Sequence, residues 1–185
     1  MPLIYKGSLD PAGSRQIIGG STTGVGWDMS TVIDNSAIVR TGDVVMIDAS
    51  GNILRATVGS ALLGILLSVA DPDGTDAAPD SGFTNQWTVA SDNETVGLKY
   101  GIVDVSPFSL YSCAADAALG TTTGSNRRGY YADVPTSIFD QIDESTAIAT
   151  RSTGGQLAIH GVDPNDSVRV IVSINEGYFH SGTGT

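Results

Sequence analysis

The sequence predicts an all-β protein, a compact antiparallel β-barrel or sandwich with at most one short helix and an extended N-terminal arm. Twenty-three glycines, together with many Asp, Ser and Thr residues, favour turns. Glutamate and lysine, which surface helices favour, occur only three times and twice. The apolar residues fall in short segments, and several of these alternate with polar residues at the period of a strand.

Residues 1–30 are expected to form the arm, and residues 31–185 a single β-barrel or sandwich domain. Two apolar patches, residues 2–5 and 16–18, are separated by turn-forming residues in this arm. Because they lie outside the regularly patterned part of the chain, we interpret the segment as an arm or edge strand rather than core. The residues that we expect to contact other chains there are Ile4, Tyr5, Ile17 and Ile18.

The regular strand pattern begins near residue 38. Val44–Ile47 is expected to be a strand, and residues 53–57 its return strand after a turn in which Gly51 can adopt a positive φ. Residues 62–67 form a buried strand interrupted by Gly64. Short strands separated by such turns are typical of an antiparallel barrel or sandwich.

The second half of the chain has a less even pattern. Residues 95–105 alternate at period two, and residues 168–174 give the strongest strand pattern. Residues 113–119, which are rich in alanine, are the best candidate for a helical turn. Residues 71–82 and 120–129 are expected to be loops. Further short strands are expected at 86–90, 108–111, 130–134, 147–150 and 156–160, while 137–142 fits a helix or a strand.

Alternation within the strongest strands predicts which side chains share a buried face. The expected core residues are Val44, Met46, Ile53, Leu62, Ile65, Leu98, Ile102, Val170 and Val172.

Charge and composition exclude several classes of protein. Nine Lys and Arg against twenty Asp and Glu give a net charge of −11. Nucleic acids and anionic membranes are bound through clustered basic side chains, so we expect neither as a direct partner. The longest apolar run, residues 61–70, is too short to span a bilayer, and the N-terminal stretch lacks the apolar segment of a secretory signal. The single cysteine, Cys113, allows no intramolecular disulfide and is expected to fill the core.

No catalytic or phosphate-binding motif of fixed spacing occurs in the sequence. A Ser/His/Asp triad that uses His160 or His180 has no support from spacing. We therefore expect no catalytic residue, no cofactor and no metal.

Residues 71–80 carry four aspartates, and calcium sites collect oxygen ligands from short loops of this kind. The spacing does not fit an EF-hand loop, so a solvated turn is the preferred interpretation and a calcium site the alternative. The four residues are Asp71, Asp73, Asp76 and Asp80.

Four short patterns occur in order along the chain: a G-D-x-V strand, a D-x-x-G turn, a glycine-spaced stretch and a closing V-x-V strand. They are carried by Gly42, Asp43 and Val45, by Asp48 and Gly51, by Ala56, Gly59 and Gly64, and by Val168, Val170 and Val172. In this combination they resemble the small all-β capsid decoration (cement) proteins of tailed bacteriophages.

The resemblance implies a structural virion protein that is not an enzyme. Such a protein is made in the host cytoplasm, binds the outer surface of the capsid and stabilises contacts between major capsid subunits. Its implied partners are the major capsid protein and further copies of itself, as a homotrimer. Because arginine matches carboxylates with a planar fork, three arginines join the arm residues as candidate contacts. These are Arg15, Arg127 and Arg128.

Two other classes stay open. A carbohydrate-binding or adhesive β-module of a phage or cell surface would need exposed aromatic side chains. The candidates are Trp27, Trp87, Tyr130 and Tyr131. A small β-barrel enzyme with dispersed catalytic residues is the third class.

Overall fold

A computed structural model of the chain describes residues 4–8, 16–18, 27–106, 109–115, 129–134, 141–142 and 155–175. The described structure is mostly β, with antiparallel sheets and one short helix, which confirms the predicted fold class. The helix, α1, spans Asn93–Val96. The strands are β1 (Ile4–Ser8), β2 (Gln16–Ile18), β3 (Trp27–Val32), β4 (Ile38–Arg40), β5 (Val44–Ile47), β6 (Ile53–Arg55), β7 (Leu62–Ala70), β8 (Gln86–Thr88), β9 (Tyr100–Asp104), β10 (Ser109–Ala115), β11 (Tyr131–Ala132), β12 (Gln141–Ile142), β13 (Leu157–Asp163) and β14 (Asp166–Ile174).

The first sheet has the order β2-β3-β9-β7-β5-β6, and it curls until β6 meets the end of β3. Ile33, which follows β3, forms a parallel bridge with Ile53 of β6. Next to it, the amide of Asp34 donates to the carbonyl of Ile53 at 2.8 Å. The hydroxyl of Thr31 donates to the carbonyl of Gly51 at 3.1 Å. Strands β3, β9, β7, β5 and β6 thus close into a barrel, and we call this junction the seam.

A separate two-stranded ribbon, β4 with β8, completes the barrel core. Val39 and Trp87, which are paired across the ribbon, are both buried. The indole N–H of Trp87 donates to the carbonyl of Ala77 at 2.9 Å, so its polar atom is satisfied inside the core. The barrel core consists of Ile33, Val39, Val45, Ile53, Leu63, Leu66, Val69, Ala77, Trp87, Val89, Val103 and Val105.

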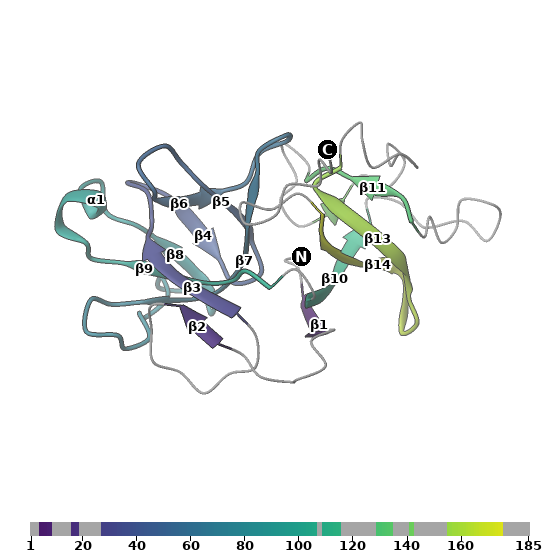
Figure 1. Ribbon diagram of the computed structural model, residues 1–185. Helices are drawn as coiled ribbons and strands as arrows, with labels where there is room; N and C mark the ends of the chain where they lie inside the picture. The colour runs from purple at the N-terminus through teal and green to yellow at the C-terminus, as the bar shows by residue number, and fades with distance from the viewer. Residues whose placement is uncertain are drawn as a thin grey trace.

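The second sheet has the order β1-β10-β14-β13-β11, and β12 pairs in parallel with β10. Figure 1 shows this sheet on the right and the barrel strands on the left. Strands β1 and β10 are hydrogen-bonded neighbours, with Tyr5 opposite Tyr111, although the whole barrel lies between them in the sequence. The barrel is therefore inserted between two adjacent strands of the second sheet.

Strand β7 is covered on both faces because it contributes to two cores. Leu63 and Leu66 belong to the barrel core, whereas Leu62 and Ile65 pack with the buried side chains of the second sheet. This double burial explains the near-continuous apolar run of β7. A Cβ on Gly64 would overlap the carbonyl oxygen of Asp104 in β9, so only glycine fits where these two strands meet.

The predicted core is largely confirmed. Ile53, Leu62, Ile65, Val170 and Val172 are buried. Three further predicted residues, Val44, Met46 and Ile102, are half-buried. The prediction for Leu98 is wrong, since 43% of this residue is exposed.

The error at Leu98 arises because the strand expected over residues 95–105 begins only at Tyr100. The residues before it form α1, which ends at Gly97 with a left-handed φ of 60°. The buried side-chain amide of Asn93 fixes this turn by donating to the carbonyls of Ile33 at 2.6 Å and Lys99 at 3.1 Å. Leu98 lies in the connection between helix and strand.

The helical turn expected over residues 113–119 is wrong in its described part. Cys113 belongs to β10 and lies opposite Val170 of β14. Tyr111 and Cys113 are both buried in the second core. Burial of this strand face outweighs the helix propensity of the neighbouring alanines. Residues 116–119 lie outside the described part of the chain.

The described pieces of the expected arm pair with strands of the same chain. β1 runs antiparallel to β10 and β2 runs parallel to β3, so each lies at the edge of a different sheet. Strand β3 begins at Trp27 and crosses the boundary expected at residue 30. The division into arm and domain stays a prediction.

Candidate functional site

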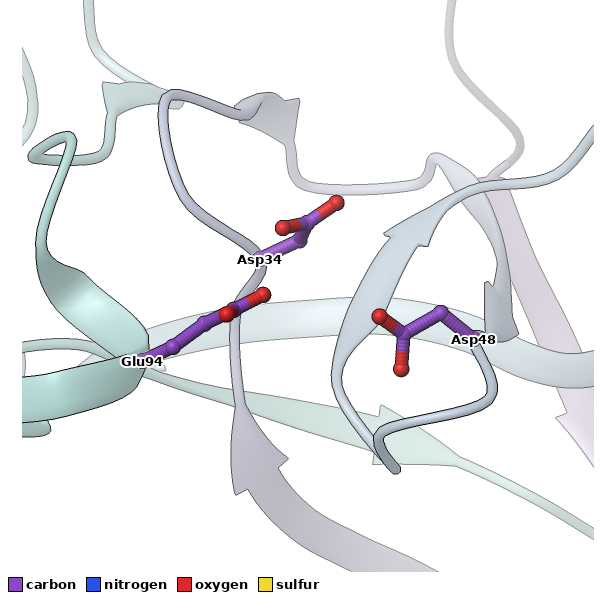
Figure 2. A group of neighbouring side chains, drawn as sticks. All are labelled: Asp34, Asp48 and Glu94. Carbon is purple, nitrogen blue, oxygen red and sulfur yellow. The ribbon is translucent and has the colours of Figure 1, made fainter.

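Three carboxylates converge beside the seam and form what we call the carboxylate trio (Figure 2). Asp34 follows β3, Asp48 follows β5 and Glu94 belongs to α1. One carboxylate oxygen from each lies within 4.8 Å of the other two. Asp34 and Asp48 are half-buried, and Glu94 is exposed.

Closure of the barrel brings these residues together. The amide of Asp34 takes part in the seam through its bond to Ile53. Asp48 shapes the tight turn between β5 and β6, because its Oδ1 accepts the amides of Ser50 and Asn52, each at 2.8 Å. The amide of Glu94 donates to Oδ1 of Asn35 at 2.9 Å, which holds the start of α1 against the segment after β3.

The electrostatics of the trio are unfavourable for three full negative charges. None of the three forms an ion pair with a described Lys or Arg side chain. The pKa of Glu94 is raised, first by its hydrogen bond with Asp34, then by desolvation and by the negative charges of Asp34 and Asp48. A hydrogen bond from the side chain of Asn52 opposes this shift. Glu94 therefore holds a proton more readily than an isolated glutamate does.

Chemically, the trio offers hard oxygen ligands of the kind that Ca²⁺ and Mg²⁺ prefer. Three carboxylates supply fewer ligands than the six to eight oxygens typical of calcium, so water would have to complete the shell. A shared proton relieves the same repulsion without a metal.

The sequence did not point to the trio. Its residues come from three separate turns, which are brought together by the Ile33–Ile53 bridge and by the bond from the amide of Glu94 to Asn35. A weak signal was present, since Asp34 and Asp48 each directly follow an isoleucine.

The aspartates of residues 71–80 serve other purposes. Asp71 forms an ion pair with Lys99 at 2.7 Å. Oδ1 of Asp73 accepts the amide and the hydroxyl of Thr75, at 2.9 and 2.7 Å, which lowers the pKa of Asp73. Asp80 accepts the amide and the hydroxyl of Thr88, and its pKa is lowered for that reason. These bonds shape a turn and favour the preferred interpretation over a calcium site.

Four of the seven predicted contact residues lie in edge strands of the two six-stranded sheets. Ile4 and Tyr5 lie in β1 opposite Ser112 and Tyr111, at the edge of the second sheet. Ile17 and Ile18 lie in β2 opposite Asp28 and Met29, at the edge of the first. Arg15, Arg127 and Arg128 lie outside the described residues. That these seven residues contact other chains stays a prediction.

The aromatic residues proposed for carbohydrate binding do not all face solvent. Trp87 is only 7% exposed and belongs to the barrel core. Tyr131 is half-buried, whereas Tyr130 is 36% exposed. Trp27 lies at the start of β3.

Comparison with known proteins found no matching family model, no similar curated protein and no similar solved structure. Among the described residues, no helix has the length and apolar character needed to cross a membrane.

Proposed function

We propose that this protein is a structural component of a virion. It binds the exterior of a tailed-bacteriophage head and stabilises contacts between major capsid subunits, and it catalyses no reaction.

The observation that carries the proposal is that Asp43, Gly51 and Gly64, three of the residues behind the family resemblance, are structural parts of the barrel. Asp43 is 2% exposed, accepts the amide of Arg40 at 2.7 Å and forms an ion pair with Arg55 at 3.0 Å. Gly51 adopts a φ of 88° in the turn that meets the seam. Gly64 allows β7 to approach β9. A family that shares these residues would share this barrel, which supports the resemblance.

Charge supports an external position. Packaged DNA would repel a chain with a net charge of −11 inside the head, whereas on the outer surface of the head the chain lies away from this repulsion. Many copies that each bridge neighbouring subunits would reinforce the head even if every contact were weak, because bridging makes the later contacts intramolecular.

The test compares phage heads assembled with and without this protein. Heads without it should package DNA but release it at a lower temperature, or on chelation or osmotic shock. The purified protein, added back, should sediment with these heads and restore their stability.

Two results would contradict the proposal. Equal DNA retention with and without the protein would remove the stabilising role. Binding of the isolated chain to a glycan panel, without binding to heads, would favour the carbohydrate-binding alternative.

A further inference from the structure

Two exposed aliphatic side chains and a tyrosine lie together where α1 joins β9. Val96, the last residue of α1, is 50% exposed, and Leu98, in the connection, is 43% exposed. The hydroxyl of the half-buried Tyr100 lies beside Gly97, because a Cβ on this glycine would be 2.9 Å from it. We call Val96, Leu98 and Tyr100 the α1 patch. In Figure 1, α1 lies on the side of the barrel away from the second sheet, so that sheet does not cover the patch.

Buried and paired side chains hold the α1 patch in place. The fully buried side-chain amide of Asn93 donates to the carbonyls of Ile33 and Lys99, which ties α1 to both neighbouring strands. Gly97 ends the helix with a left-handed conformation, and the side chain of Lys99 is fixed by its ion pair with Asp71. A surface that is already ordered loses little conformational freedom when it binds, which favours association.

Negative charge borders the α1 patch on one side. Glu94 lies two residues before Val96, and its carboxylate converges with those of Asp34 and Asp48 (Figure 2). None of the three carboxylates forms an ion pair with a described Lys or Arg side chain, and Lys99 already has its partner. A partner that covers the exposed aliphatic side chains therefore comes close to three carboxylates, which attract positive charge and repel negative charge.

We propose that the α1 patch binds a basic segment of another protein, whose apolar side chains cover Val96 and Leu98 and whose Lys or Arg side chains meet the carboxylate trio. An apolar centre with a charged rim is the arrangement of protein–protein interfaces. The net charge of −11 draws a basic partner toward the chain and repels a second copy of it. This association does not depend on the proposed function.

The test is fluorescence anisotropy of the purified full chain with a short labelled peptide in which lysines surround a central pair of leucines. We expect a Kd between about 1 μM and 1 mM, the range of weak association. A peptide with serines in place of the leucines should bind about tenfold more weakly or less, because it buries no apolar surface on the patch. Binding of both peptides should weaken as the salt concentration rises.

Variants locate the binding surface. The double variant Val96→Ser, Leu98→Ser should weaken binding of the leucine peptide by about tenfold or more, and Leu98→Ser alone should give a smaller loss. Glu94→Gln should weaken binding by about two- to fivefold, as expected for one exposed charge pair. Two matched controls should bind like the wild type. Phe83→Ser removes an apolar side chain that is 50% exposed outside the patch, and Asp73→Asn removes an exposed carboxylate outside the trio.

Three results would overturn the proposal. Equal binding of the leucine and serine peptides would mean that charge alone attracts them. A double variant or a Leu98→Ser variant that binds like the wild type would place the peptide elsewhere. Sedimentation velocity of the chain without peptide tests the other occupant, because self-association that the double variant loses would assign the patch to a second copy. Far-ultraviolet circular dichroism should give the same spectrum for every variant, since both serine substitutions lie at exposed positions.

Discussion

Removing the hydroxyl of Tyr111 should destabilise the protein by about 1.5–3 kcal/mol, the range for a buried hydrogen bond to a charged group. Tyr111 and Asp104 are both fully buried where the chain passes from β9 of the barrel to β10 of the second sheet. The tyrosine hydroxyl donates to Oδ2 of Asp104 at 2.7 Å. The same oxygen accepts the hydroxyl of Ser109 at 2.7 Å, and Oδ1 accepts the amide of Ser106 at 2.9 Å. Tyr111→Phe removes one donor from this carboxylate and leaves the ring packing in place.

Chemical and thermal unfolding measure the loss. For a chain of this size, each kcal/mol corresponds to about 2–4 °C, so the midpoint should fall by about 3–12 °C. Tyr131→Phe is the matched control, because Tyr131 is half-buried and its hydroxyl has no partner among the described residues. It should change the free energy of unfolding by less than about 0.5 kcal/mol. If Tyr111→Phe were as stable as Tyr131→Phe, the Asp104 network would not join the barrel to the second sheet as we argue.

Three further predictions concern the trio, the strand contact and the core. Because the pKa of Glu94 is raised, the folded state binds a proton at Glu94 more tightly than the unfolded state does. Protonation of Glu94 therefore stabilises the folded state fully below the ordinary glutamate pKa of 4.5, and this stabilisation is lost as the pH rises through the raised pKa. The free energy of unfolding in urea, measured across this pH range, should therefore fall for the wild type relative to Glu94→Gln as the pH rises. The same pH dependence in both proteins would contradict the close approach of the three carboxylates. Gly64→Ala should lower the free energy of unfolding by at least about 1–3 kcal/mol, because the added Cβ would overlap the carbonyl of Asp104. An unchanged unfolding midpoint would refute the close approach of β7 to β9 at this position. Val170→Ala should lower the free energy of unfolding by about 1–4 kcal/mol, because Val170 is 1% exposed, and Leu98→Ala should lower it by less than about 1 kcal/mol, because Leu98 is 43% exposed. Equal losses in thermal unfolding would contradict the assignment of Val170 to the core and Leu98 to the surface.

Local sequence patterns predicted those elements whose side chains alternate or run continuously apolar. β14 was predicted because its valines and isoleucines alternate, and β7 because burial on both faces requires an apolar run. The helix was placed wrongly because the alanines after Cys113 favour a helix locally, whereas pairing with β14 requires a strand. Leu98 fits the alternation of β9, but the left-handed Gly97 turns the chain just before it.

The candidate site was less accessible to the same reasoning. The trio depends on the parallel bridge that closes the barrel and on the bond between Glu94 and Asn35, and no local spacing encodes such long-range contacts. Arg127 and Arg128, which the sequence favoured as contact residues because they lie in a loop of small residues, lie outside the described residues.

The insertion of the barrel between β1 and β10 has a consequence for synthesis on the ribosome. At about 5–20 residues per second, the chain from Tyr5 to Tyr111 takes on the order of 5–20 s to emerge. Every residue of the barrel core lies between Ile33 and Val105, so the barrel can close during this interval. β1 leaves the ribosome first but has no β10 to pair with until the barrel has been made. The nascent chain therefore carries β1 unpaired until the barrel has been made, and the second sheet is completed after the barrel.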